Sequence, residues 1–329
     1  MINRQLIRIK IVQLTYAYYQ NGSKNIESAE KELLFSLSKA YDLYNHLLAL
    51  IVAVSKEARR RVEILTQRAQ REGTEPPSTR FIDNKFALQL EENKALAEFV
   101  SGRDRIWDGS MEFVRKLCTQ IEQSRTYADY MCDESDSYDV DRELWRKLYK
   151  QLFQNNDELS AVIEEKSLYW NDDKDIVDTF VMKTIKRFDP KNGSRQELLP
   201  EYSDEDDKEF ACRLFRATIL NAEQYQRYMS EASRNWDFSR LAYMDVVIMQ
   251  IAIAEMLLFD NIPVSVTINE YVDLARMYST MKSGGYINGM LDAIARHLNA
   301  TGRMHKAMNV PRSKNGKEAT AAETSRGEE

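Results

Sequence analysis

The 329-residue chain contains few of the residues that shape turns, disulfides and metal sites: eleven glycines, six prolines, three cysteines and three histidines. Because sheets and α/β units need Gly and Pro at their many turns, this scarcity favours an all-α fold. Cys118, Cys132 and Cys212 share no Cys-x-x-Cys spacing and cannot all pair, so we expect inert buried thiols without a disulfide or a thiolate metal site. Three histidines also make an imidazole metal site or a Ser-His-Asp arrangement a poor expectation.

Long apolar runs and nucleotide-binding motifs are absent too. The sequence has no run of about 18 uncharged apolar residues, and bases interrupt its apolar N-terminus. We therefore expect a cytoplasmic protein without a membrane span or a secretion signal. No Gly-x-Gly-x-x-Gly follows a strand, and acid pairs such as Asp172-Asp173 lie in polar surroundings that would not raise a carboxyl pKa. We expect no catalysis, no cofactor and no metal.

The distribution of Gly and Pro predicts where the helices and loops lie. Residues 23–72, 110–189 and 201–262 contain neither residue type, and each stretch is long enough for two or more helices. Loops are expected at 73–80 and 189–203, and the tail after Gly302 has the composition of disorder. Residues 246–259 are apolar nearly all round, which predicts a central buried helix. Two amphipathic helices follow it, and the apolar face of the second consists of Ile287, Leu291, Ile294 and Leu298. The C-terminal part should therefore be a compact helical bundle.

Charge is unevenly distributed along a chain of net charge −6. At helical spacing the first 20 residues place Ile7, Ile11, Leu14 and Tyr18 on an apolar stripe, and we expect the adjoining stripe to stay exposed, namely Arg4, Arg8, Thr15 and Tyr19. Residues 56–71 carry six bases against two acids, which suggests a nonspecific RNA contact or an ordinary solvated helix face. On spacing and charge alone, an ordinary solvated helix surface is the favoured interpretation of both basic segments.

Several motifs in the C-terminal part form an ordered series: Leu-Ala-Tyr-Met-Asp at 241–245, Asp-Asn-Ile-Pro at 260–263, Ile-Asn-Glu at 268–270, and Tyr-Ile-Asn-Gly-Met-Leu-Asp at 286–292. This series resembles the C-terminal half of the NusB transcription antitermination factors. The N-terminal Arg4, Arg8, Gln13, Leu14 and Tyr16 are similar to the arginine-rich first helix of that family. The resemblance implies an all-α, NusB-type helical bundle with an additional helical insertion. The expected division is 1–44 (N-terminal helices), 45–200 (insertion), 201–302 (C-terminal bundle) and 303–329 (disordered tail).

The resemblance also implies a function. Members of the family bind boxA-type RNA of nascent ribosomal RNA together with the ribosomal protein NusE, within the transcription elongation complex and away from membranes. Carried over by position, the RNA-binding residues are Arg4, Arg8, Lys10, Gln13, Lys282, Ser283, Tyr286 and Asn288, and the partner-binding residues are Tyr16 and Glu255. We expect the basic first helix to lie beside the turn into the last helix, so that both hold one RNA strand. Without the resemblance, Tyr16, Glu255 and Tyr286 are read as packing residues and Asn288 as a local cap.

Two other classes of function are alternatives to an antitermination factor. A helical scaffold for ribosome biogenesis would keep the NusE contact with weak or no sequence-specific RNA binding. An RNA methyltransferase with a NusB-like domain is disfavoured because the chain offers no αβ region for a methyl donor. For the antitermination factor, replacing Arg4 and Arg8 with alanine should weaken boxA binding, reduce its salt dependence and leave the fold intact.

Overall fold

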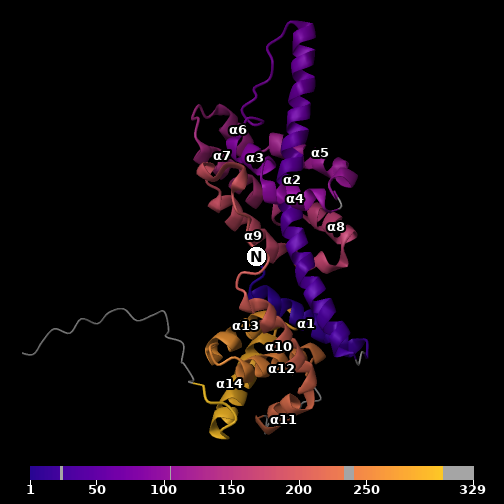
Figure 1. Ribbon diagram of the computed structural model, residues 1–329, viewed down its shortest axis with the longest axis vertical. Helices are drawn as coiled ribbons and strands as arrows, with labels where there is room; N and C mark the ends of the chain where they lie inside the picture. Colours follow the sequence, from indigo (N-terminus) through magenta and orange to yellow (C-terminus); the bar gives the residue numbers. More distant parts are fainter. Residues whose placement is uncertain (23–24, 104, 233–240, 307–329) are drawn as a thin grey trace, which may run out of the picture. The chain divides into compact units, whose positions relative to one another are not determined.

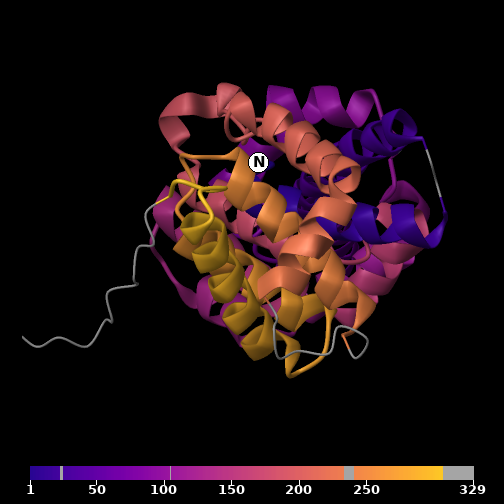
Figure 2. The ribbon, with the colours of Figure 1, turned by 90° about the horizontal axis from the view of Figure 1, so that it is seen from below.

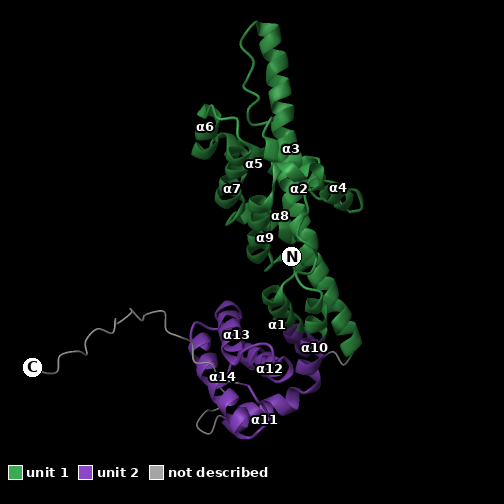
Figure 3. Ribbon diagram, turned by 60° about the vertical axis from the view of Figure 1, so that its left-hand side comes forward, with its two compact units in different colours: residues 1–14, 24–212 green, residues 15–23, 213–329 purple. Residues whose placement is uncertain are grey.

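The computed structural model describes residues 1–22, 25–103, 105–232 and 241–306. Within these residues the chain is all-α, as the composition predicts, and its only extended pairing is an isolated bridge between Ile2 and Tyr202. Two compact units divide the chain (Figure 3). Unit 1 contains residues 1–14 and 24–212, and unit 2 contains residues 15–23 and 213–329.

Unit 1 is formed mainly by the helices between the first helix and α10. The first part of α1 and the first part of α10 also belong to it. Its elements in chain order are α1 (Arg4–Gln20), α2 (Ile26–Glu72), α3 (Lys85–Glu91), α4 (Lys94–Ser101), η1 (Asp108–Ser110), α5 (Met111–Glu122), α6 (Arg125–Cys132), α7 (Tyr138–Leu148), η2 (Tyr149–Phe153), α8 (Asp157–Lys166), η3 (Leu168–Trp170), α9 (Lys174–Arg187), η4 (Pro190–Arg195) and α10 (Asp206–Leu220).

Helix α2 is the longest element of unit 1 (Figure 1). The side chain of Asn25 accepts a hydrogen bond from the Ser28 amide at its start, and Gly73 ends it in the left-handed conformation at φ 66°. No Gly or Pro interrupts the 47 residues between, so the helix runs for about 70 Å. The stretch 23–72, which is long enough for two or more helices of ordinary length, therefore forms a single one. Helices α3, α4, α5 and α9 all pack against α2 and bury its apolar face.

Unit 2 is a bundle of helices that pack side by side, drawn in orange to yellow in Figure 2. Besides the end of α1 and the end of α10, its elements are α11 (Ala222–Ala232), α12 (Tyr243–Leu258), α13 (Val264–Tyr278) and α14 (Ser283–Ala300). Helix α12 is buried at almost every position from Val247 to Met256, which confirms the prediction of a central buried helix. Helix α14 buries Ile287, Leu291, Ile294 and Leu298, the positions that the sequence spacing predicts.

The structure also bears on the loops, the tail and the thiols. Residues 73–80 lie in the connection between α2 and α3, and residues 189–203, which include η4, lie between α9 and α10, as expected. The expected boundary at 44/45 falls inside α2. The expected disordered tail lies, from residue 307 onward, outside the described residues. Cys118 is buried, whereas Cys132 is exposed and Cys212 is half-buried, so the expectation of buried thiols is correct for Cys118 and wrong for Cys132.

Candidate nucleic-acid and partner interface

The N-terminus of α1 is fixed in unit 1 by backbone pairing. The Ile2 amide donates to the Glu201 carbonyl at 2.6 Å, and the Ser203 amide donates to the Ile2 carbonyl at 2.7 Å. The Asn3 side chain then accepts from the Leu6 amide and caps the helix. Burial lowers the pKa of the α-amino group of Met1 to about 5. These contacts set the position from which the first arginines of α1 project.

Arg4 and Arg8 share one aromatic partner. Their guanidinium carbons lie 5.0 and 5.7 Å from the centroid of the Phe210 ring, a cation–π geometry. Arg4 also lies 3.5 Å from the carboxylate of Asp207, and 33% of its side chain is exposed. Arg8 is only 4% exposed and Thr15 is fully buried. The prediction of an exposed stripe through Arg4, Arg8, Thr15 and Tyr19 is therefore wrong for Arg8 and Thr15.

Further along α1, the candidate residues Lys10 and Gln13 hold the segment that precedes α9. The Lys10 ammonium lies 2.7 Å from a carboxylate oxygen of Asp173 and donates to the Tyr169 carbonyl at 3.0 Å. Both charged side chains are almost fully buried, and this burial raises the pKa of Asp173. The expectation of polar surroundings that would not raise this pKa is therefore wrong for Asp173. Gln13 donates from Nε2 to the carboxylate of Asp172 at 3.0 Å. Lys10 is thus a structural cation of unit 1 rather than a solvent-facing one.

The other RNA-binding candidates lie in unit 2, around the start of α14. Lys282 and Asn288 are exposed and Tyr286 is half-buried. Ser283, in contrast, is 2% exposed, and its hydroxyl donates to the carboxylate of Asp245 at 3.0 Å. The same hydroxyl lies 2.8 Å from that of Thr280. Ser283 therefore fixes the turn into α14, and its neighbours Lys282, Tyr286 and Asn288 form the side that reaches solvent.

A group of tyrosines surrounds the partner candidate Tyr16 in unit 2. The Tyr16 and Tyr243 rings meet edge to face at 5.8 Å, and those of Tyr19 and Tyr243 at 6.4 Å. Gln250 donates to the hydroxyl of Tyr19 at 2.7 Å, and burial raises the pKa of this hydroxyl to about 12. Tyr243 stays 46% exposed. Sequence reasoning did not single out Tyr243 as a contact residue, although this tyrosine stands in the Leu-Ala-Tyr-Met-Asp motif at 241–245.

Glu255, the second partner candidate, lies in the core of unit 2. It is fully buried and accepts hydrogen bonds from the hydroxyls of Thr267 and Tyr271, both at 2.9 Å. Two good donors satisfy a carboxylate that would otherwise be costly to bury. Its carboxylate therefore links α12 to α13, which is the packing role that the sequence left open, and does not reach the surface of the described chain.

The basic run on α2 is neutralised partly by acids that are distant in sequence and partly by acids of α2 itself. Glu91 of α3 lies 2.9 Å from Arg59 and 3.7 Å from Lys56. Arg61 lies 2.7 Å from Glu122 of α5, and Arg68 pairs with Glu72 at 2.7 Å. The excess of positive charge that motivated an RNA contact over 56–71 is thus largely balanced in three dimensions. The interpretation as an ordinary helix surface explains this run better.

Neither a metal centre nor a membrane-spanning helix is found in the described ranges. No group of three or more His, Cys, Asp or Glu side chains there has the arrangement needed to hold a metal ion. Among the same residues, no helix combines the length and the apolar character required to cross a membrane.

Comparison with known proteins identifies relatives for the part of the chain from α9 to α14. The family described as the NusB family matches residues 177–296. The transcription antitermination protein NusB of Salinibacter ruber is 32% identical over 132 residues, which are 38% of this chain and 82% of that protein. The protein of the same name from Natranaerobius thermophilus is 47% identical over 82 residues, 25% of this chain and 59% of that protein.

Two further matches are to a third NusB protein and to a solved structure. The NusB protein of Chloroherpeton thalassium is 37% identical over 100 residues, so the match spans 30% of this chain and 47% of that relative. A solved structure of T. maritima NusB is 32% identical and matches 36% of this chain and 82% of that chain, with a TM-score of 0.27. The match to most of the length of the Salinibacter ruber protein, together with the family match over 177–296, places this chain in the NusB family of transcription antitermination proteins.

Proposed function

We propose that this protein is an RNA-binding antitermination factor that binds boxA-type RNA of nascent ribosomal transcripts together with ribosomal protein NusE. Family membership supports the general role. The observation that carries RNA binding is the exposed side at the start of α14, where Lys282 and Asn288 reach solvent beside the half-buried Tyr286. The role is one of binding within the cytoplasmic elongation complex, without catalysis or a cofactor.

The residue types on this side suit single-stranded RNA. A lysine attracts phosphate and releases counterions, an asparagine can read a base edge, and a tyrosine can stack on an unpaired base. From unit 1 we add Arg4, whose guanidinium is held over Phe210 and partly exposed. We assign structural roles rather than RNA-binding roles to the remaining candidates, because each makes contacts inside its own unit: Arg8, Lys10, Gln13 and Ser283.

A filter-binding salt series with boxA RNA and a scrambled RNA tests this proposal. Lys282→Ala should weaken boxA binding and lower the slope of log affinity against log salt by about 0.7, the value for one phosphate of a single strand. Arg296→Ala is the matched control, because it removes an exposed cation from the same helix, and it should leave both unchanged. Equal affinity of the wild-type chain for the two RNAs would contradict sequence-specific binding.

For NusE, we propose that Tyr16 and Tyr243 form part of the contact surface. Both rings lie in the tyrosine group of unit 2, and the exposed Tyr243 offers the large amphipathic surface that interfaces favour. In a calorimetric titration with NusE, Tyr243→Ala should weaken binding about tenfold or more. Leu220→Ala, which truncates another exposed apolar side chain of the same unit, should have little effect.

The scaffold for ribosome biogenesis remains the second candidate, and one observation favours it. Arg8, Lys10 and Gln13 make contacts within unit 1, which leaves fewer groups of α1 for RNA. A scaffold would bind NusE without preferring boxA over scrambled RNA. The same contacts change the expected result of replacing both arginines, since Arg8 is buried and its loss should reduce stability. Arg4→Ala alone is the cleaner test of α1.

A further inference from the structure

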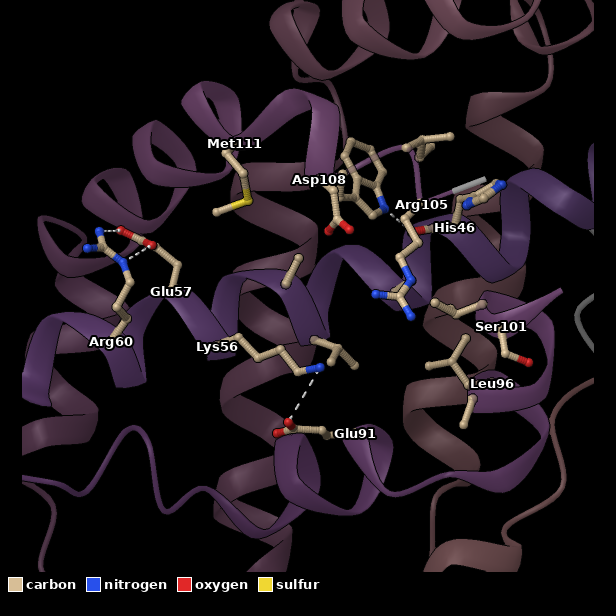
Figure 4. A pocket seen from close by; sticks show the side chains of 17 residues that line it. His46, Lys56, Glu57, Arg60, Glu91, Leu96, Ser101, Arg105, Asp108 and Met111 are labelled. Atoms are coloured by element: carbon tan, nitrogen blue, oxygen red, sulfur yellow. Dashed lines mark hydrogen bonds and ion pairs between the residues drawn. The ribbon is translucent and has the colours of Figure 1, made fainter. Parts of the chain in front are cut away.

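Unit 1 contains a cavity of about 500 Å³ that involves none of the residues proposed for RNA or NusE (Figure 4). The cavity lies along α2, between α4 and the segment that leads into α5. Its volume is within the range of protein sites for small molecules. The cavity is formed entirely by unit 1, in the part of the chain that the family match does not cover.

The floor and walls of the cavity are apolar, and the side chains that α2 contributes to them are small, which leaves the space open. Ala49, Val52 and Ala53 occupy one side of α2 and remain half-buried, since α4 and α5 pack against α2 without filling the space between them. Leu96 and Val100 of α4 complete the wall. A ligand that rests on this surface would remove apolar area from water, which is favourable by about 25 cal/mol per Å².

The edge of the cavity carries side chains of both charges. Lys56 is 60% exposed at its side chain, and Arg60 is 52% exposed. Both cations already pair with carboxylates of the lining, since Arg60 lies 2.8 Å from Glu57 and Lys56 lies 3.7 Å from Glu91.

Arg105 differs from the other arginines of this region. Its side chain extends from the loop before η1 into the cavity (Figure 4). Among the described residues no carboxylate forms an ion pair with it, and this includes Asp108, the third acid of the lining. A guanidinium presents a planar fork of donors that matches a carboxylate in two parallel hydrogen bonds. Arg105 is therefore available to an anionic group from outside the chain.

Trp107 indicates which kind of anion fits. Its ring is only 5% exposed, and its Nε1 donates to the His46 carbonyl at 2.7 Å, so it offers no open face for a base to stack on. The cavity thus combines aliphatic walls with a charged edge and lacks a platform for an aromatic ligand. We propose that it binds an aliphatic carboxylate, with the chain along Ala49 and Ala53 and the carboxylate on Arg105 beside Lys56. This inference is independent of the proposed RNA-binding function.

Calorimetric titration of the full-length chain with dodecanoate, below its micellar concentration, tests the proposal. We expect saturable binding of one molecule per chain, and at least tenfold weaker binding of dodecyltrimethylammonium, which has the same chain length and the opposite charge. Absence of saturable binding, or equal affinity for the two amphiphiles, would overturn the proposal.

Three variants locate the site. Arg105→Gln removes the charge from an exposed side chain and should weaken dodecanoate binding about tenfold, the effect expected for one charge-assisted contact. Ala53→Phe fills the cavity floor and should abolish binding, and thermal unfolding establishes that this variant is folded. Arg115→Gln removes an exposed arginine of α5 outside the lining and should leave the affinity unchanged. If Arg105→Gln binds as tightly as the wild type, the assignment is wrong, whatever the outcome for Ala53→Phe.

Discussion

At Glu57, one buried carboxylate receives two arginines from the next turn of α2. Its Oε1 and Oε2 accept hydrogen bonds from Arg60 at 2.8 Å each, and Arg61 lies 3.1 Å away. These bonds favour the ionised form, and the Arg60 contact contributes most to lowering the pKa of Glu57 below its usual value of 4.5. A lowered pKa in the folded state means that the stabilisation is present above pH 4.5 and is lost as the pH falls through the folded-state pKa.

We therefore expect Glu57→Gln to lower the free energy of unfolding by about 1–2 kcal/mol at pH 7, a value kept small because Arg60 is half exposed. The difference from the wild type should shrink as the pH falls below 4.5. Urea unfolding at a series of pH values measures this. Glu63→Gln, an exposed position on the same helix, is the control and should show almost no difference. A difference between Glu57→Gln and the wild type that does not vary with pH would refute the ion-pair explanation.

At the scale of the element, α2 and α4 end differently although both have glycine at the C-cap. Gly73 ends α2 with φ 66°, whereas Gly102 ends α4 with φ −94°. A Cβ added at Gly73 would meet no atom within 4 Å, so any penalty there comes from the backbone conformation itself. For an L-residue the left-handed conformation costs about 1–2 kcal/mol. At Gly102 this penalty does not apply, and its nearest neighbour would lie at an ordinary 3.7 Å.

The matched pair Gly73→Ala and Gly102→Ala tests this difference. Gly73→Ala should loosen the end of α2, so that amide hydrogen exchange in its last two turns accelerates about five- to thirtyfold, corresponding to 1–2 kcal/mol. Gly102→Ala should leave exchange at the end of α4 unchanged or slightly slower, because it restricts the unfolded chain. Equal effects at the two sites would show that the left-handed cap does not limit the length of α2.

At the scale of the whole molecule, the ion pair between Lys10 and Asp173 connects α1 with a segment more than 150 residues later in the chain. The side chains are 2% and 0% exposed, and Lys10 also donates to the Tyr169 carbonyl. A buried pair contributes little net stability compared with apolar residues of similar size, but removal of one partner leaves an uncompensated charge. We therefore expect unit 1 to lose stability when one partner is removed, and to lose much less when both are replaced by apolar residues.

Lys10→Ala should lower the free energy of unfolding by about 3–5 kcal/mol at pH 7. Lys10→Met combined with Asp173→Leu should recover most of this loss. Burial already raises the pKa of Asp173, so in Lys10→Ala the carboxyl takes up a proton more readily and the loss should be smaller at pH 5 than at pH 7. Denaturant unfolding at the two pH values measures both effects. If Lys10→Ala is as stable as the wild type, the ion pair does not stabilise the contact between the two segments.

Sequence and tertiary structure each decided a different part of this protein. Scarcity of Gly and Pro predicted the all-α class. The apolar character of 246–259 on all sides predicted a buried helix, and the apolar periodicity of residues 287–298 predicted a buried face, and α12 and α14 confirm both. Such features are local, because helix formation and the direction of an apolar face depend on residues three or four positions apart. The length of α2 was not determined in this way, because a stretch without Gly or Pro is compatible with one long helix and also with two shorter ones.

The solvent exposure of each charged residue was decided only by the tertiary structure. The sequence shows that Arg8, Lys10 and the run 56–71 are basic, but Phe210, Asp173, Glu91 and Glu122 come from segments far along the chain. Likewise, nothing local distinguishes the buried Glu255 from an exposed acid, because its donors stand on α13. Electrostatic and hydrogen-bonding partners act through space, so the choice between a binding residue and a structural one required the positions of helices that the sequence does not place.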